Sequence, residues 1–298
     1  MQPVTRQAHR FYDGGLDADD SHPGIPPDPA AAPQIVLRRV AEGGRERFAM
    51  QRRIAYADRH LGELLVPRVT GTFRTDLTSV PALFTWLVPK TGLHLPATLL
   101  HDGLIHPPGD VTYVSTDGHI VLRPEADRVL RDAMADAGTA LLRRWLVWSA
   151  VTTATMLSGA GTGWSRGQAL RYRVVAASTL LAIGVLGVLA TLDLADVADA
   201  PELPWMGDRG WFAELVGGLA GAVVVPLVLA LFWGRFRRAG AVVGVTLAVL
   251  LHVTAALLLL TLLYRLLEWL TAKVPRLMLA LTCLGIVVAL VVFLSLLG

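Results

Sequence analysis

The pattern of hydrophobic and polar positions divides the chain into a mixed N-terminal part and a strongly apolar C-terminal part. Most charged residues lie at or before Arg173, and the remainder consists mostly of Leu, Val and Ala. A helix needs about 20 apolar residues to cross a bilayer. Four stretches of the second part are that long: residues 174–192, 212–233, 241–263 and 277–297. The sequence therefore predicts a soluble domain joined to four transmembrane helices.

The N-terminal part begins with residues 1–33, which we expect to form a disordered, flexible tail. Much of this segment is Asp, Gly, Pro and Ala, and such a composition buries too little apolar surface to become ordered. Alternation of polar and apolar positions then predicts β-strands over residues 34–40, 47–58 and 62–66. A soluble domain with a small β-rich start is thus expected over residues 34–165.

Helical signals follow the strands. Pro96 and Pro124 each suit the first turn of a helix, and they predict one helix over residues 96–105 and a second from Pro124. After a break at Gly138, a third helix is expected over residues 141–157. Its apolar part, residues 145–160, contains several Ser and Thr and is about four residues short of a normal span. We therefore predict an α+β fold in which this segment is a core helix of the cytoplasmic domain.

Composition and charge narrow the class of protein. A hydrophobic share of 53% against 17% charged residues excludes a chain that folds entirely in water. The net charge of +3 is small and the basic residues are scattered among acidic ones, so nucleic acid is not expected as a partner. Cys283 is the single cysteine, so no intramolecular disulfide can form.

The positions of the arginines predict how the chain crosses the membrane. Loops rich in Lys and Arg stay on the cytoplasmic side. Three arginines precede the first predicted span, and three more lie between the second and third: Arg166, Arg171 and Arg173, then Arg235, Arg237 and Arg238. The loop between the first and second spans is acidic and contains Asp193, Asp196, Asp199, Glu202 and Asp208. We therefore expect a multi-pass protein of the inner (cytoplasmic) cell membrane with both termini in the cytoplasm. The lipid bilayer is its expected partner, and the transmembrane helices are candidates for a homo-oligomer interface.

Several short motifs occur in a fixed order in the soluble part. They are Val66-Pro67, residues 73–81 with TDLTSVP, residues 99–104 with the His-Asp pair of HDGL, and residues 125–134 with EAD. Taken together they resemble a domain family of unknown function whose members occur in phages and bacteria. The resemblance covers about residues 35–164 and leaves out the apolar tail. It implies a fold and a phage or bacterial setting, and no activity.

A more distant likeness concerns chemistry. A helical His-Asp pair followed by a second helix with an inward Asp is similar to the arrangement of phospholipase A2, especially its bacterial form. A neutral His can take a proton from water while a carboxylate orients it, and Ca²⁺ on a second carboxylate stabilises an oxyanion. This likeness implies His101 as base and Asp127 as its orienting partner, with Asp102 and Asp76 as ligands of Ca²⁺. The glycine-rich calcium loop and the disulfides of those lipases are missing.

Structural interpretations of the same residues remain open. The His101-Asp102 pair can bond nearby backbone, Asp76 fits a turn, and Asp127 can pair with Arg123 or Arg131 at helical spacing. Two hypotheses of function follow. The leading one is a membrane-anchored interaction or structural module on the cytoplasmic face. The alternative is a His-Asp ester hydrolase that acts on membrane lipid, which requires His101 and Asp127 to meet within hydrogen-bonding distance in a cleft.

Overall fold

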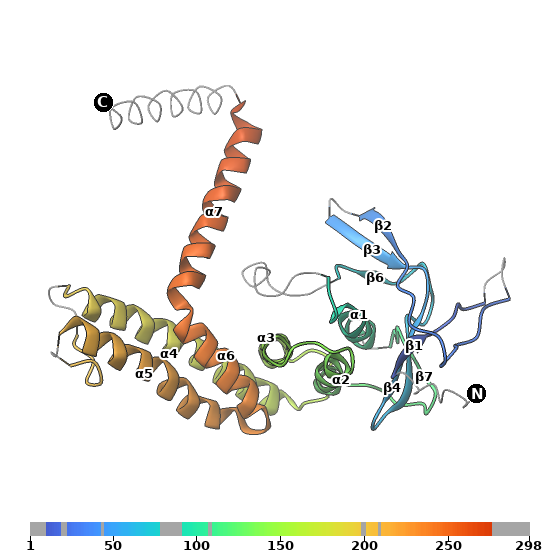
Figure 1. The fold of residues 1–298 in the computed structure, drawn as a ribbon, viewed down its shortest axis with the longest axis horizontal. Coiled ribbons are helices and arrows are strands. Elements are labelled where there is room, and N and C mark those ends of the chain that lie inside the picture. Colours follow the sequence, from blue (N-terminus) through green and yellow to red (C-terminus); the bar gives the residue numbers. More distant parts are fainter. Residues whose placement is uncertain are drawn as a thin grey trace, which may run out of the picture. The chain divides into compact units, whose positions relative to one another are not determined.

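The computed structural model describes residues 10–18, 23–42, 45–77, 91–106, 109–197, 201–207 and 210–275. The chain divides into two compact units, Met1–Val249 and Leu250–Gly298. In the first unit a small β-rich region precedes a helical part, although the short strand β7 (Val114–Ser115) follows the first helix, α1 (Leu95–Leu104) (Figure 1). The predicted α+β class is therefore confirmed.

Two antiparallel sheets make up the β-rich region. The four-stranded sheet has the order β1-β4-β5-β7, with bounds Phe11–Asp13, Ile54–Asp58, Gly62–Val66 and Val114–Ser115. The three-stranded sheet has the order β2-β3-β6, with bounds Leu37–Glu42, Arg45–Met50 and Arg74–Thr75. The predicted strand at residues 62–66 is confirmed as β5. The strand expected at residues 34–40 begins later, at Leu37.

The single strand predicted over residues 47–58 is wrong, because the structure has two strands there. β3 ends at Met50 and β4 begins at Ile54, and the two belong to different sheets. Between them the backbone of Arg53 bonds to Gly14 and Gly15 in the segment after β1. The alternation of apolar residues hardly changes across this bend, so the pattern did not show that the pairing partners change.

Part of the segment expected to be a flexible tail is ordered. Phe11–Asp13 pair with Ile54–Tyr56 of β4, and the ring centroids of Phe11 and Tyr56 are 4.7 Å apart. The carboxylate of Asp13 accepts a hydrogen bond from Nε of Arg52 at 2.7 Å. These partners lie about forty residues further along the chain, which is why the local composition did not reveal them.

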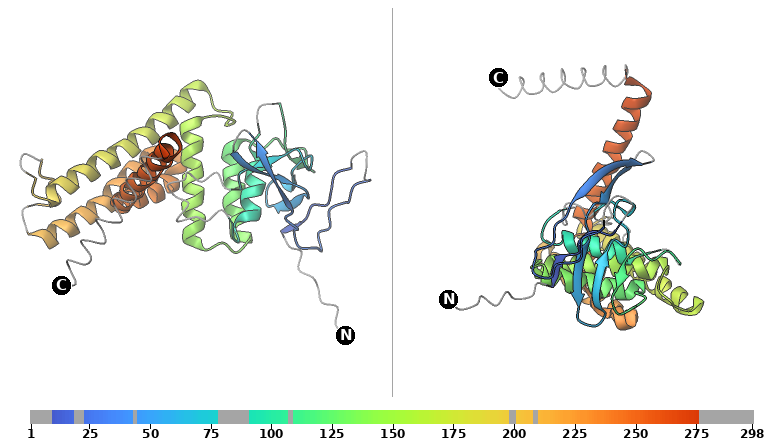
Figure 2. Two further views of the ribbon diagram at one scale, coloured as in Figure 1. Left: turned by 90° about the horizontal axis from the view of Figure 1, so that it is seen from above. Right: turned by 90° about the vertical axis from the view of Figure 1, so that its right-hand side faces the viewer.

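Three helices pack in succession next to the sheets. They are α1 (Leu95–Leu104), α2 (Arg123–Asp136) and α3 (Leu141–Ser158). Both ends of α1 and α3 and the start of α2 lie within one residue of the predicted positions. α1 lies on β4 and β5, α2 packs on α1, and α3 packs on α2 (Figures 1 and 2). A Cβ atom on Gly103 would lie 2.1 Å from Cγ1 of Val66, so glycine is required where α1 meets β5.

The remaining helices of the first unit are apolar. α4 (Arg166–Leu194) is followed by α5 (Trp211–Ala230), a short 3₁₀ segment η2 (Leu231–Phe236) and α6 (Arg237–Val249). Gly234 has a non-helical backbone (φ 58°, ψ −121°), and α6 turns back onto α5 so closely that a Cβ on Gly244 would lie 2.9 Å from Pro226. Trp233 joins this hairpin to α4 by donating from Nε1 to Oγ1 of Thr179 at 3.0 Å.

The arginine-rich ends of α4 and α6 lie together. The ring of Phe236 is 5.3 Å from that of Tyr172 and 5.9 Å from that of Trp164. Arg173, near the start of α4, donates to the carbonyl oxygens of Leu157 and Ser158 at the end of α3. Helix α3 is therefore attached at the end of the apolar bundle that carries its arginines.

The described chain has three stretches long and apolar enough to cross a membrane, not four: Arg166–Leu194, Trp211–Val249 and Leu251–Lys273. The span predicted over residues 174–192 lies within α4. The second stretch contains the turn at Gly234, and the continuous span predicted over residues 241–263 is wrong, because the chain leaves helical geometry at Leu250 between α6 and α7 (Leu251–Lys273). The fourth predicted span, residues 277–297, lies outside the described residues. α3 is not one of the three stretches.

Candidate functional site

The packing of α1 against α2 brings His101 and Asp127 together. Nε2 of His101 is 2.9 Å from Oδ1 of Asp127, and only 4% and 1% of the two residues are exposed. The predicted convergence of these side chains is confirmed. With Nε2–H donating to the carboxylate, Nδ1 carries the lone pair of the neutral ring. The pairing of Asp127 with Arg123 or Arg131 is not what the structure has, because Arg123 bonds Thr155 and Arg131 bonds Asp132.

The second carboxylate oxygen of Asp127 has no hydrogen-bond partner among the described residues, although it is buried. A buried carboxylate oxygen without a partner costs free energy. Such costs concentrate at sites where a protein has a use for the group. This oxygen therefore distinguishes Asp127 from an ordinary structural carboxylate.

Asp102 connects α1 to β6. Oγ1 of Thr75 donates to Oδ2 of Asp102 at 2.7 Å and accepts from the backbone N–H of Leu77 at 2.9 Å. Burial raises the pKa of the Asp102 carboxyl above its ordinary value of 3.8, and the hydrogen bond from Thr75 acts in the opposite direction. The protonated form of Asp102 is thus more favoured than that of an exposed aspartate.

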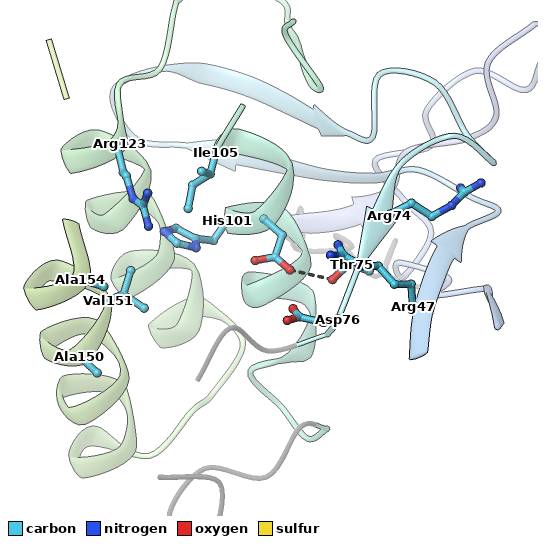
Figure 3. Close-up of a pocket in the computed structure, with 11 residues that line it drawn as sticks. Arg47, Arg74, Thr75, Asp76, His101, Ile105, Arg123, Ala150, Val151 and Ala154 are labelled. Atoms are coloured by element: carbon cyan, nitrogen blue, oxygen red, sulfur yellow. Dashed lines mark hydrogen bonds between the residues drawn. The ribbon is translucent and has the colours of Figure 1, made fainter. Parts of the chain in front are cut away.

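A pocket of about 300 Å³ opens beside these residues (Figure 3). Its polar wall includes His101, Asp102 and Thr75 together with the exposed Asp76. Its apolar wall comes from α1 and α3: Ile105, Ala150, Val151 and Ala154. Three of the four predicted site residues line this pocket, and Asp127 lies behind His101.

Three arginines also line the pocket, and none of them was predicted as a site residue. Arg47 comes from β3, Arg74 from β6 and Arg123 from the start of α2. They are widely separated along the chain and share no motif. The topology that places β3 and β6 side by side brings two of them together, and a local pattern does not contain that information.

The donors in this pocket do not fit Ca²⁺, which takes about six to eight oxygen ligands. In the part of the chain that the structure describes, no group of three or more His, Cys, Asp or Glu is placed to hold a metal ion. Residues 78–90, which the structure does not describe, contain no Asp or Glu. Three arginines line the pocket together with the two carboxylates Asp76 and Asp102, and their positive charge opposes a cation.

Comparison with curated proteins gave no match, and neither did comparison with solved structures. A comparison with protein families gave one, which covers less than half of the chain. It begins in β3 and ends in α3, and it leaves out the apolar helices that follow. His101, Asp102 and Asp127 therefore belong to a region, residues 48–151, that matches the family model described as "Protein of unknown function (DUF1353)".

Proposed function

We propose that this chain is a membrane-anchored hydrolase in which His101 is the general base for cleavage of an ester of a membrane lipid. The observation that carries the proposal is the buried hydrogen bond between His101 and Asp127 at the wall of the pocket. A His whose ring is oriented by a carboxylate, with its other nitrogen available, is the arrangement that proton abstraction from water requires.

The proton balance of the reaction needs only the ring of His101. Nδ1 takes a proton from water while the resulting hydroxide attacks the ester carbonyl and forms a tetrahedral intermediate. When the bond to the leaving alkoxide breaks, the imidazolium returns the proton to it, so an acid and an alcohol are released and the ring is neutral again. Asp127 accepts the Nε2–H bond throughout and stabilises the imidazolium.

The position of the pocket in the fold supports a lipid as substrate. Its apolar wall includes three residues of α3, and α3 packs directly against the apolar helices α4 and α6. An ester presented by the bilayer beside these helices would have a high local concentration at the pocket. The apolar wall matches an acyl chain.

We also propose that the soluble domain lies on the cytoplasmic side of the cell membrane, in a phage or bacterial setting. In support, the arginines in the first turns of α4 and those of the η2–α6 turn lie at one end of the bundle, the end that contacts α3. Tags at either terminus should be accessible only after the cells are permeabilised. Labelling of intact cells would contradict this orientation.

The main experiment measures release of fatty acid from mixed phospholipid–detergent micelles by the purified full-length chain. We expect His101→Ala to lower the rate by about 10²–10⁴-fold, the contribution typical of a general base. His119→Ala is the matched control, because His119 is exposed and lies outside the pocket. Equal rates for the wild type and His101→Ala, or no release by either, would contradict the proposed hydrolysis.

A second candidate is a non-catalytic interaction or structural module at the membrane. The observation that favours it is that the same polar bonds tie elements together: Thr75 to Asp102 joins β6 to α1, and His101 to Asp127 joins α1 to α2. If this is the whole role of these residues, His101→Ala will lower the melting temperature in detergent and no ester substrate will be cleaved by the wild type.

A further inference from the structure

The pocket beside His101 carries more positive than negative charge. Arg47, Arg74 and Arg123 line it together with the two carboxylates Asp76 and Asp102. A pocket with this balance attracts an anion and repels a metal cation.

Arg123 is held in place by bonds that leave the end of its side chain available. Its backbone N–H donates to the carbonyl of Gly161 at 2.9 Å, and its Nε donates to Oγ1 of Thr155 at 3.1 Å. Among the described residues, its two terminal nitrogens make no hydrogen bond. Figure 3 shows the guanidinium of Arg123 directed toward the ring of His101. A guanidinium fixed in this way loses little conformational entropy when it binds an anion.

Arg47 reaches the pocket from the other side. It lies on β3 opposite Val40 of β2, and Figure 3 shows its side chain extending from that strand toward Thr75. No hydrogen bond or ion pair of Arg47 occurs within the described residues. Arg74 is different, since its guanidinium donates to the carbonyl oxygens of Gly71 and Phe73 and points away from His101 in Figure 3.

We propose that Arg47 and Arg123 bind a phosphate group of the ligand, and that they supply there the positive charge that a Ca²⁺ ion would otherwise supply. This proposal rests on the proposed function in one respect: the ligand is a substrate only if the chain hydrolyses it. Binding of the phosphate group itself does not require hydrolysis. Guanidinium groups pair with phosphate oxygens through two charge-assisted hydrogen bonds at once. The apolar wall of Ile105, Val151 and Ala154 then faces the hydrocarbon of the same molecule.

The test measures binding to the full-length chain in a neutral detergent by isothermal titration calorimetry. Three probes separate the parts of the ligand: dihexanoyl phosphatidate, dihexanoylglycerol, which lacks the phosphate, and inorganic phosphate. We expect phosphatidate to bind at least about tenfold more tightly than dihexanoylglycerol, and Arg47→Gln and Arg123→Gln each to remove about tenfold of that affinity. Addition of EDTA should leave the affinity unchanged.

Three further variants serve as controls. Arg38→Gln removes the same charge from the neighbouring strand β2 at an exposed position outside the pocket, and it should bind as the wild type does. Arg123→Lys keeps the charge if Arg123→Gln fails to fold, and it should retain part of the phosphate preference. His101→Ala should still bind phosphatidate more tightly than dihexanoylglycerol, so that a failure of the proposed hydrolysis is distinguishable from a failure of the phosphate site.

The binding results distinguish a phospholipid from a soluble phosphate ester as the ligand, and some of them would contradict the proposed phosphate site. Inorganic phosphate binding as tightly as phosphatidate supports the site with a soluble phosphate ester as ligand, whereas a clear preference for phosphatidate supports a phospholipid. The proposal is overturned if phosphatidate and dihexanoylglycerol bind equally. It is also overturned if the two pocket variants bind as Arg38→Gln does, or if Ca²⁺ is needed for binding.

Discussion

Asp127 and Arg128 are neighbours in α2, but their side chains have opposite environments. Asp127 points to α1, makes one hydrogen bond to His101 and keeps its second oxygen buried without a partner in the described structure. Arg128 points to β4, where it donates to both oxygens of Asp58, and it also pairs with Glu125 and Asp132 on its own helix. On one face of α2 the charge of Asp127 is thus incompletely paired, whereas on the other face Arg128 is paired with three carboxylates.

The difference separates structural from functional use of charge. A network in which each buried charge has its partners contributes stability and leaves nothing for a ligand. A buried carboxylate with an unused oxygen is less favourable for folding, and it is retained where it orients a reacting group. We therefore expect substitutions at Asp127 to change activity and substitutions at Arg128 to change stability.

The largest effect is expected for Asp127→Asn, which keeps the shape of the side chain and removes its charge. The amide no longer stabilises an imidazolium at His101, so the rate of ester hydrolysis should fall by about 10²–10⁴-fold. The melting temperature should change little, because a buried and incompletely paired charge is lost at the same time. Thermal unfolding and fatty-acid release by the same preparation test this. A large loss of stability with unchanged activity would make Asp127 a structural residue.

Arg128→Gln should have the converse effect. It leaves Asp58, whose side chain has no exposed surface, without its charged partner. Breaking a buried ion pair in this way costs about 3 kcal/mol of the free energy of unfolding. Arg131→Gln is the matched control, since its ion pair with Asp132 is more exposed. The activity of the folded fraction should equal that of the wild type. An Arg128→Gln variant that is stable but inactive would contradict the assignment of Arg128 to stability and of Asp127 to activity.

The stability difference between the wild type and Arg128→Gln should depend on pH. Burial alone would raise the pKa of Asp58, but the hydrogen bonds from Arg128 and from the backbone of His60 bring that pKa below its ordinary value of 3.8. A lowered pKa in the folded state stabilises the protein above pH 4 or so, and this contribution is lost as the pH falls through the folded-state pKa. The difference in melting temperature should therefore be largest at pH 7 and shrink toward pH 3.

The helices and the histidine pair were predictable because their signals are local. Pro96 and Pro124 sit in the first turn of α1 and α2, and Gly159 ends α3 in a left-handed conformation. His101 and Asp127 lie on consecutive helices, and the packing of α2 on α1 places them within hydrogen-bonding distance. The limits of the helices depend on residues close together in the sequence, and the pair depends on two helices that follow one another along the chain.

The missed features depend on pairing between distant segments. β1 becomes ordered through β4, and the strand over residues 47–58 divides because each half pairs with a different sheet. Arg47 and Arg123 meet at one pocket from β3 and α2. The break at Leu250 has no Gly or Pro beside it. In each of these cases no local preference of the residues indicates the outcome.

The smallest effect is expected for Tyr56→Phe, which tests a second charged network at the end of α2. The hydroxyl of Tyr56 donates to Oδ2 of Asp136 at 2.7 Å, and Arg59 bonds both oxygens of the same carboxylate. Because Arg59 remains after the substitution, the loss of one hydrogen bond should cost about 1 kcal/mol. Activity should not change, since Asp136 lies outside the pocket. A small fall in melting temperature with full activity would extend the contrast from Arg128 to this network, whereas a loss of activity would show that the stabilising networks of α2 also position His101.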